Sequence, residues 1–405
     1  MADNDNRLLG ADFVRAGACM IVLLHHLGQR VDHDSALGRE PWQVFSNGGG
    51  LGVGIFFVLS GFLLSLPFWR ALDAGTALPS LRVYALRRAA RILPGFWLTL
   101  TLTFILSFTL FGATLDQWLW IRFFAGFFLV SDWHWLTLFP VEVNAPLWSI
   151  GFEITAYAIL PLGFVALALL GRPLPAIIKR VAWLAIIALA LGAHMAFSHF
   201  VEVDPINKGW EYGLQGGAKT WMPWFNPFSF FAMFALGALV GGVQTFVARW
   251  HHWVFDLVFV AALVAAGQYM WDLASDEQGE FFGWLRVPYA FPTMHLIVGF
   301  ALATGPSSLL AGRLFDNSVV RYIARISFGI YVWHYLLIEL ARELFVPKLV
   351  YGQMTDPGLF WLTALGIVGA SVLIADLSYR WLEAPIMAWA RRFERRPIAT
   401  APQPA

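Results

Sequence analysis

Residues 15–26 read RAGACMIVLLHH, an apolar run that begins with an arginine and ends with two histidines. Apolar runs of about 20 residues, the length that spans a bilayer as a helix, recur along the whole chain. The chain is 59% hydrophobic and 13% charged, whereas soluble proteins carry about 25% charged residues. The alternating ten-residue pattern of a membrane β-barrel is absent. The sequence therefore predicts an all-α polytopic membrane protein.

Ten segments are long and apolar enough to be membrane spans: 11–29, 48–69, 90–111, 145–170, 177–199, 226–247, 252–271, 289–309, 323–346 and 358–382. A shorter apolar stretch, 117–131, carries Arg122 and is predicted to be re-entrant or interfacial. If the N-terminus is cytoplasmic, 17 of the 27 Lys and Arg residues fall on the inner side and 7 on the outer side. We therefore expect about ten spans with both termini in the cytoplasm. The predicted division is a membrane domain, 1–390, and a basic, Pro/Ala-rich cytoplasmic tail, 391–405.

Composition also argues against several kinds of partner. The net charge of +1 gives no electrostatic footprint for a nucleic acid. The single cysteine, Cys19, excludes an intrachain disulfide and a cysteine-built metal site. His25 and His26 are adjacent and not four residues apart, so they fit a metal site on one helix face poorly. No metalloprotease, nucleotide-loop or nucleophile-elbow motif is present. We expect no metal cofactor.

Arg15 and His26 are 11 residues apart, nearly three helical turns, so they share one helix face about 16 Å apart. Asp12 lies one turn before Arg15 and can pair with it. An unpaired charge in a span costs at least a few kcal/mol, so such residues face a protein interior or a wet cavity. The alternative is a snorkelling arginine and an interfacial histidine. Periodicity alone does not separate the two interpretations.

Two further segments carry charge at the membrane. Arg88 and Arg91 lie one turn apart beside Arg87, an arrangement that suits a phosphate-bearing ligand. Simple anchoring on the inner side is the alternative, and it is favoured if the cluster is taken alone. Glu153 lies in an otherwise apolar helix and is a candidate acid/base partner for His26. Its alternative is a structural ion pair.

These segments together resemble the membrane-bound acyltransferase-3 family, over residues 8–388. The resemblance rests on LLGADFVRAGACMIVLLHH (8–26), GIFFVLSGFLLS (54–65), LRRAARILPGFW (86–97), APLWSIGFEITAYAILP (145–161), RISFGIYVWHYLLI (325–338) and LSYRWLEAPI (377–386). The order and spacing of the six segments carry the resemblance.

The resemblance implies a multi-pass O-acyltransferase of the bacterial inner membrane. Such a protein moves an acyl group, most often acetyl, from cytoplasmic acyl-coenzyme A to a hydroxyl of a carbohydrate or lipid-linked sugar. It implies that Arg15, Arg88 and Arg91 hold the donor. His26 is then a general base or a transient acyl carrier, and Glu153 orients it. The supporting residues that the resemblance implies are Asp12, Ser60, Trp148, Ser149, Tyr331 and His334. Direct transfer and an acyl-enzyme relay both stay open.

Two other functions are compatible with the residues. A proton-coupled transporter or exporter of a glycan or small metabolite would also bury Arg, His and Glu, and without the motifs it would be favoured. A non-catalytic membrane sensor is the third. Aromatic residues in the long outer loops suit a carbohydrate, although interfacial belts are the commoner reason for them. Gly- and Ala-rich helices such as 258–267 can pack within the chain or between copies, so the oligomeric state is open.

Overall fold

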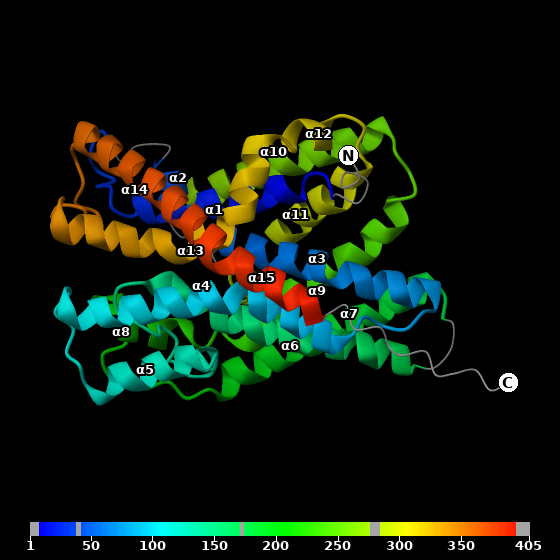
Figure 1. Cartoon of the computed structure of the whole chain (residues 1–405), viewed down its shortest axis with the longest axis horizontal. Coiled ribbons are helices and arrows are strands. Elements are labelled where there is room, and N and C mark those ends of the chain that lie inside the picture. Colours follow the sequence, from blue (N-terminus) through cyan, green and yellow to red (C-terminus); the bar gives the residue numbers. More distant parts are fainter. Residues whose placement is uncertain (1–7, 38–41, 171–173, 276–283, 394–405) are drawn as a thin grey trace.

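The computed structural model describes residues 8–37, 42–170, 174–275 and 284–393. The predicted tail from residue 394 on, with Arg7, Arg39 and Arg172 of the charge count, lies outside these ranges. The α-helices are α1 Ala11–Gly28, α2 Trp42–Gly48, α3 Leu51–Ala74, α4 Leu81–Thr109, α5 Gln117–Phe127, α6 Trp148–Leu169, α7 Ala176–Phe200, α8 Gly213–Trp221, α9 Pro227–Val247, α10 Trp253–Ser275, α11 Thr293–Thr304, α12 Ala311–Phe315, α13 Ser318–Leu344, α14 Pro357–Ser378 and α15 Ala384–Ala390. Figure 1 shows them gathered into one bundle, with α3 and α9 between the other helices.

The all-α membrane architecture is confirmed. Within the described ranges, nine helices are long and apolar enough to cross a membrane. The predicted span at 289–309 is instead α11, whose 12 residues reach only about 18 Å, less than the thickness of a bilayer core. Pro292 precedes α11 and Pro306 follows it, and proline does not continue a helix from either position. The stretch predicted not to span forms α5, which has 11 residues.

Local sequence sets where several of these helices begin. The Ser80 hydroxyl accepts a hydrogen bond from the backbone N–H of Val83 and caps α4. Asn226 and Ser229 form a reciprocal capping box at the start of α9, with Pro227 in the first turn. Because Ser80 starts α4 nine residues earlier than its apolar run, the arginine motif lies inside the helix.

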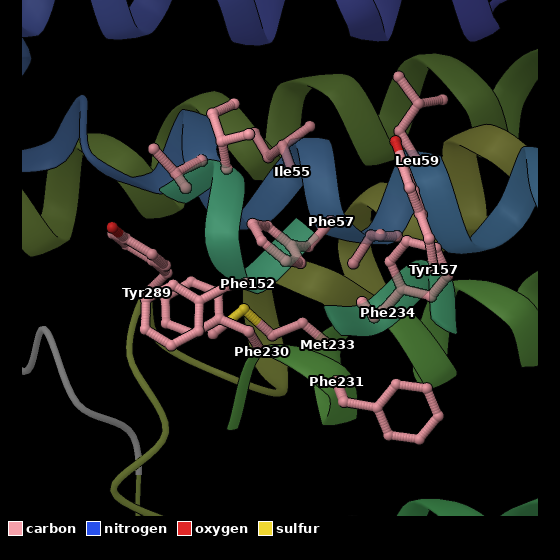
Figure 2. Packing of buried hydrophobic residues seen from close by; sticks show 14 of the residues in the cluster. Ile55, Phe57, Leu59, Phe152, Tyr157, Phe230, Phe231, Met233, Phe234 and Tyr289 are labelled. Carbon is pink, nitrogen blue, oxygen red and sulfur yellow. The ribbon is translucent and has the colours of Figure 1, made fainter. Parts of the chain in front are cut away.

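Helices α3 and α9 pack with their backbones almost in contact. A β-carbon at Gly61 would lie 1.9 Å from the backbone oxygen of Phe234, and one at Gly237 would lie 2.0 Å from that of Val58. Small residues allow helices in a membrane to approach this closely. Beside this contact, the rings of Phe152 and Phe230 stack with centroids 4.4 Å apart (Figure 2).

Replacing Gly61 by alanine should destabilise the bundle severely. The added methyl group meets backbone and not a movable side chain, so α3 and α9 must separate, at a cost of about 3 kcal/mol or more. The measurement is the yield of monodisperse protein and its melting temperature in detergent. The control is Gly267→Ala in α10, because no atom lies within 4 Å of a β-carbon there. Equal behaviour of the two variants would contradict the tight contact.

The segment between α5 and α6 folds inward. Leu138, Phe139 and Val141 are fully buried, and the Asn144 side-chain amide donates a 2.9 Å hydrogen bond to the backbone oxygen of Val332 in α13. Val332 lies near the middle of α13, so this hydrogen bond ties the chain just before α6 to the middle of α13. The contact helps to position the side chains of the first two turns of α6.

Asp132, which lies outside the nine spans, is buried in this segment. Burial raises its pKa from 3.8 to about 6, against the opposing effect of a 2.7 Å hydrogen bond from Thr155. The folded state therefore favours the protonated carboxyl. Asp132 therefore adds about 3 kcal/mol to the free energy of unfolding below about pH 4. This contribution is lost as the pH rises through about 6.

Asp132→Asn should remove this pH dependence and leave the protein more stable than wild type at pH 7. The measurement is the melting temperature in detergent at several values between pH 4 and pH 7. The control variant is Asp34→Asn, at an exposed position, which should follow wild type. A constant difference between Asp132→Asn and wild type over the whole pH range would contradict a raised pKa for Asp132.

Candidate active site

A cavity of about 640 Å³ lies between α1, α3, α4, α6, α13 and α15. Most of the polar residues that the sequence singles out lie in its wall. The polar and charged lining residues are Arg15, Ser60, Arg87, Arg88, Arg91, Ser149, Glu153, Tyr157, Ser327, Tyr331 and Arg391. A volume of this size is typical of a pocket for a substrate or cofactor.

One end of the cavity is strongly basic. Five of its lining side chains are arginines and one is a carboxylate. Arg87 and Arg391 are exposed, while Arg15, Arg88 and Arg91 are half-buried. The positive charge therefore runs from the protein surface into the bundle. Such a site suits an anionic ligand with more than one phosphate group.

Arg91 is the most firmly held of these arginines. Its guanidinium donates a 2.9 Å hydrogen bond to the backbone oxygen of Arg325 and lies 3.7 Å from the buried carboxylate of Glu383. It also lies over the ring of Tyr379, 5.8 Å from the centroid. These contacts join α4 to α13 and to the π-helical turn Tyr379–Glu383 that follows α14.

Glu153 lies at this basic end. It accepts a hydrogen bond from the Tyr157 hydroxyl, and its electrostatic neighbours are Arg88, Arg15 and Arg91. Arg15 is about 16 Å from His26 along α1, so the carboxylate is not placed to touch the histidine. The sequence predicts Glu153 as an acid/base partner of His26; in the structure its charged neighbours are these arginines.

Two hydroxyl groups that share a hydrogen bond form another part of the cavity wall. The Tyr331 and Ser149 hydroxyls share a hydrogen bond of 2.7 Å, and the Tyr331 hydroxyl also donates to the backbone oxygen of Pro146. Phe56 meets the Tyr331 ring edge to face, with centroids 5.9 Å apart. Beyond Tyr331, the ring of His334 follows at 6.0 Å, one turn further along α13.

His26 belongs to a separate cluster beyond Tyr331. Its imidazole stacks on His334 with centroids 5.3 Å apart, and the edge of Tyr335 lies 4.9 Å away. In the part of the chain that the structure describes, neither His26 nor His334 lies in the cavity wall. His26 is half-buried, whereas His334 is fully buried.

The hydrogen bonds of the two histidines define which nitrogen carries the hydrogen. His26 Nδ1 lies 3.1 Å from the side-chain oxygen of Gln29, and His334 Nδ1 lies 2.8 Å from the backbone oxygen of Tyr331. Amide oxygens only accept, so each Nδ1 donates and each Nε2 keeps its lone pair when the ring is neutral. Both Nε2 atoms are therefore candidate proton acceptors.

The other predicted residues occupy supporting positions. Asp12 interacts electrostatically with Arg15, as the sequence predicts. Ser60 lies in the cavity wall. Trp148 packs against Phe225 and Phe230 and holds the start of α6.

Among the charged lining residues, Arg391 is the one that the sequence did not indicate as part of a binding site. The paired arginines after the last apolar run indicate only inner-side anchoring, and no spacing rule connects them to residues 300 positions earlier. The described residues contain no group of three or more His, Cys, Asp or Glu side chains that could hold a metal ion.

Comparison with known proteins supplies the family. The model of the acyltransferase-3 family, described as an acyltransferase domain, matches residues 8–380. The chain is 25% identical over 377 residues to acyltransferase MdmB of Streptomyces mycarofaciens, covering 88% of this chain and 85% of that protein. It is 26% identical over 391 residues to peptidoglycan O-acetyltransferase OatA of Listeria monocytogenes, covering 93% of this chain.

The O-acetyltransferase OatA of Staphylococcus aureus is 25% identical over 389 residues, which cover 94% of this chain. The chain spans 55% and 57% of the length of the two OatA proteins, a little more than half. The family match covers every helix that lines the cavity except α15. This chain belongs to the acyltransferase-3 family and is a membrane acyltransferase.

Proposed function

We propose that the protein transfers an acyl group, in the simplest case acetyl, from acyl-coenzyme A to a hydroxyl of a carbohydrate acceptor in the bacterial cell envelope. The proposal rests on a cavity and a pair of histidines that follow one another in the bundle. An arginine-lined cavity runs from the protein surface to Tyr331, and a stacked pair of histidines follows one helical turn beyond.

The donor's chemistry fits the cavity. Coenzyme A carries a diphosphate and a 3′-phosphate, about four negative charges at neutral pH. The five arginines and Glu153 that line the cavity give a formal charge of +4. The wall also contains apolar residues, among them Phe56, Phe57 and Leu63, which suit the uncharged pantetheine arm. The thioester would then lie toward Ser149 and Tyr331.

His26 is the proposed general base. Its Nε2 takes the proton of the acceptor hydroxyl while the hydroxyl oxygen attacks the thioester carbonyl carbon. The carbon–sulfur bond breaks, and the leaving sulfur receives the proton from His26. His334, which stacks on His26, and Gln29, which accepts from Nδ1, hold the imidazole in the required orientation. A relay that passes through an acyl-histidine would use the same nitrogen.

Glu153 has a different proposed role from the one its sequence position suggests. Together with Tyr157 it lies among Arg15, Arg88 and Arg91, which would repel one another without a carboxylate. We therefore assign it to holding the arginines in position for the donor. The charge asymmetry of the sequence supports a cytoplasmic location for this basic end, where acyl-coenzyme A is available.

The acceptor class follows from the relatives. Two of them are named O-acetyltransferases, one of them for peptidoglycan, so a glycan hydroxyl of the cell envelope is the acceptor we favour. The half-buried position of His26, beyond the end of the donor cavity, supports an approach of the acceptor from the side opposite to the arginines.

The test is acyl transfer in membranes that contain the protein. Membranes are supplied with acetyl-coenzyme A labelled in the acetyl group, and label is counted in the extracted envelope glycan. Label above that of protein-free membranes supports the proposal. Purified protein that fails to bind acetyl-coenzyme A at millimolar concentration would overturn it in favour of transport.

A further inference from the structure

The C-terminal helix α15 forms one wall of the cavity. Met387 and Ala390 of α15 and the residue that follows, Arg391, line the cavity together with Arg87 and Arg88 of α4. Figure 1 shows α15, in red, crossing the bundle beside α4. The last part of the chain that the structure describes thus contributes a positive charge at the mouth of the site.

The π-helical turn Tyr379–Glu383 explains how the chain reaches this position. Single π-helical turns inside helices change the direction of the side chains that follow and are frequent at functional sites. Here the turn places the carboxylate of Glu383 in the interior, 3.7 Å from the Arg91 guanidinium, where Ser378 also donates to it at 3.3 Å. Glu383 thereby fixes α15 against α4, with Arg391 on the cavity side.

Two properties of Arg391 bear on its role. Like Arg87 it is exposed, whereas Arg15, Arg88 and Arg91 are half-buried, so it meets the part of a ligand that lies nearest to solvent. It also lies beyond residues 8–380, the part that the family model matches. The family assignment therefore says nothing about its role.

We propose that Arg391 recognises the nucleotide end of the acyl donor and binds its 3′-phosphate. This inference rests on the proposed donor, acyl-coenzyme A. With the thioester toward Ser149 and Tyr331, the diphosphate reaches the half-buried arginines, and the 3′-phosphate is the anionic group left at the exposed mouth. A guanidinium presents the paired donors that suit a phosphate there. Arg391 is a binding residue that makes the site discriminate between phosphorylated and dephosphorylated donors.

The experiment compares two donors and two variants in nanodiscs of zwitterionic lipid. The donors are acetyl-coenzyme A and 3′-dephospho-acetyl-coenzyme A, and the measured quantity is the dissociation constant. The variants are Arg391→Gln and its neighbour Arg392→Gln, which removes the same charge at an exposed position outside the cavity wall. Elution as a single monodisperse species establishes that each variant is folded.

Wild type should bind acetyl-coenzyme A about 10-fold more tightly than the dephosphorylated donor. Arg391→Gln should bind acetyl-coenzyme A about 10-fold more weakly than wild type and should bind the dephosphorylated donor as wild type does. Arg392→Gln should bind both donors as wild type does. An equal loss for both donors, or equal effects of the two variants, would overturn the assignment to the 3′-phosphate.

A second set of binding measurements, in nanodiscs with and without anionic lipid, tests whether the phosphate at Arg391 belongs to the donor or to a lipid headgroup. If an anionic lipid occupies Arg391, its substitution has no effect in zwitterionic nanodiscs and changes donor binding only when anionic lipid is added. That result would overturn the inference and leave the proposed function standing. Wild type that binds neither donor would overturn the proposed function itself.

Discussion

His26→Gln is expected to lower acyl transfer by about 100- to 10,000-fold while binding acetyl-coenzyme A as tightly as wild type does. The size of the loss is that of removing a positioned general base. Binding is retained because His26 lies outside the wall of the donor cavity, beyond Tyr331. The measurement pairs the initial rate of glycan labelling with the dissociation constant of acetyl-coenzyme A on the same preparation.

His25→Gln is the matched control for this prediction. His25 precedes His26 on α1 with the two ring centroids 4.8 Å apart, but its Nδ1 lies 3.1 Å from the backbone oxygen of Phe45 in α2 and so has a different partner. Its replacement should leave the rate within a few-fold of wild type. Transfer that survives in His26→Gln, or that disappears equally in both variants, would remove His26 from the chemistry.

Arg88→Gln is expected to show the opposite pattern, a dissociation constant for acetyl-coenzyme A about 10- to 100-fold higher than that of wild type. A charge-assisted hydrogen bond inside a half-buried site contributes about 1.5–3 kcal/mol. We choose Arg88 and not Arg91 because the Arg91 side chain also joins α4 to Glu383 and to the backbone of Arg325, so its replacement would disturb the structure as well. The measurement is equilibrium binding of labelled acetyl-coenzyme A.

Arg82→Gln is the control on the same helix. Arg82 is exposed, lies six residues before Arg88, and is not part of the described cavity wall. It should bind the donor as wild type does. If the two variants weaken binding equally, the effect comes from the general positive charge at this face, and the cavity is not the donor site.

The sequence predicted the fold well where side-chain chemistry alone decides it. The length and apolarity of each run define nearly every span, and helical periodicity places Arg15 and His26 on one face of α1. In the structure Arg15 lines the cavity and His26 contacts α13. The predicted span at 289–309 was wrong because this apolar segment contains two prolines, Pro292 and Pro306, that limit α11 to 12 residues.

The sequence predicted most of the charged residues of the candidate site but not which of them lie next to one another. Arg15, Arg88, Arg91 and Glu153 come together because each charge requires a polar interior. Which groups surround Glu153 depends on how α6 packs, and a hydrogen bond from Asn144 ties the chain just before α6 to α13. A contact between residues 188 positions apart leaves no local signal in the sequence. Arg391 was missed for the same reason, because a π-helical turn brings it to the cavity.

A cryo-electron microscopy structure with a non-hydrolysable thioether analogue of acetyl-coenzyme A shows directly whether the arginine-lined cavity holds the donor. We expect density through the cavity, with phosphates against the arginines of α4 and the acyl end at Ser149 and Tyr331, next to His334 and His26. At a saturating concentration of the analogue, an empty or lipid-filled cavity would contradict this expectation. So would an analogue bound in the opposite direction, with its acyl end at Arg391.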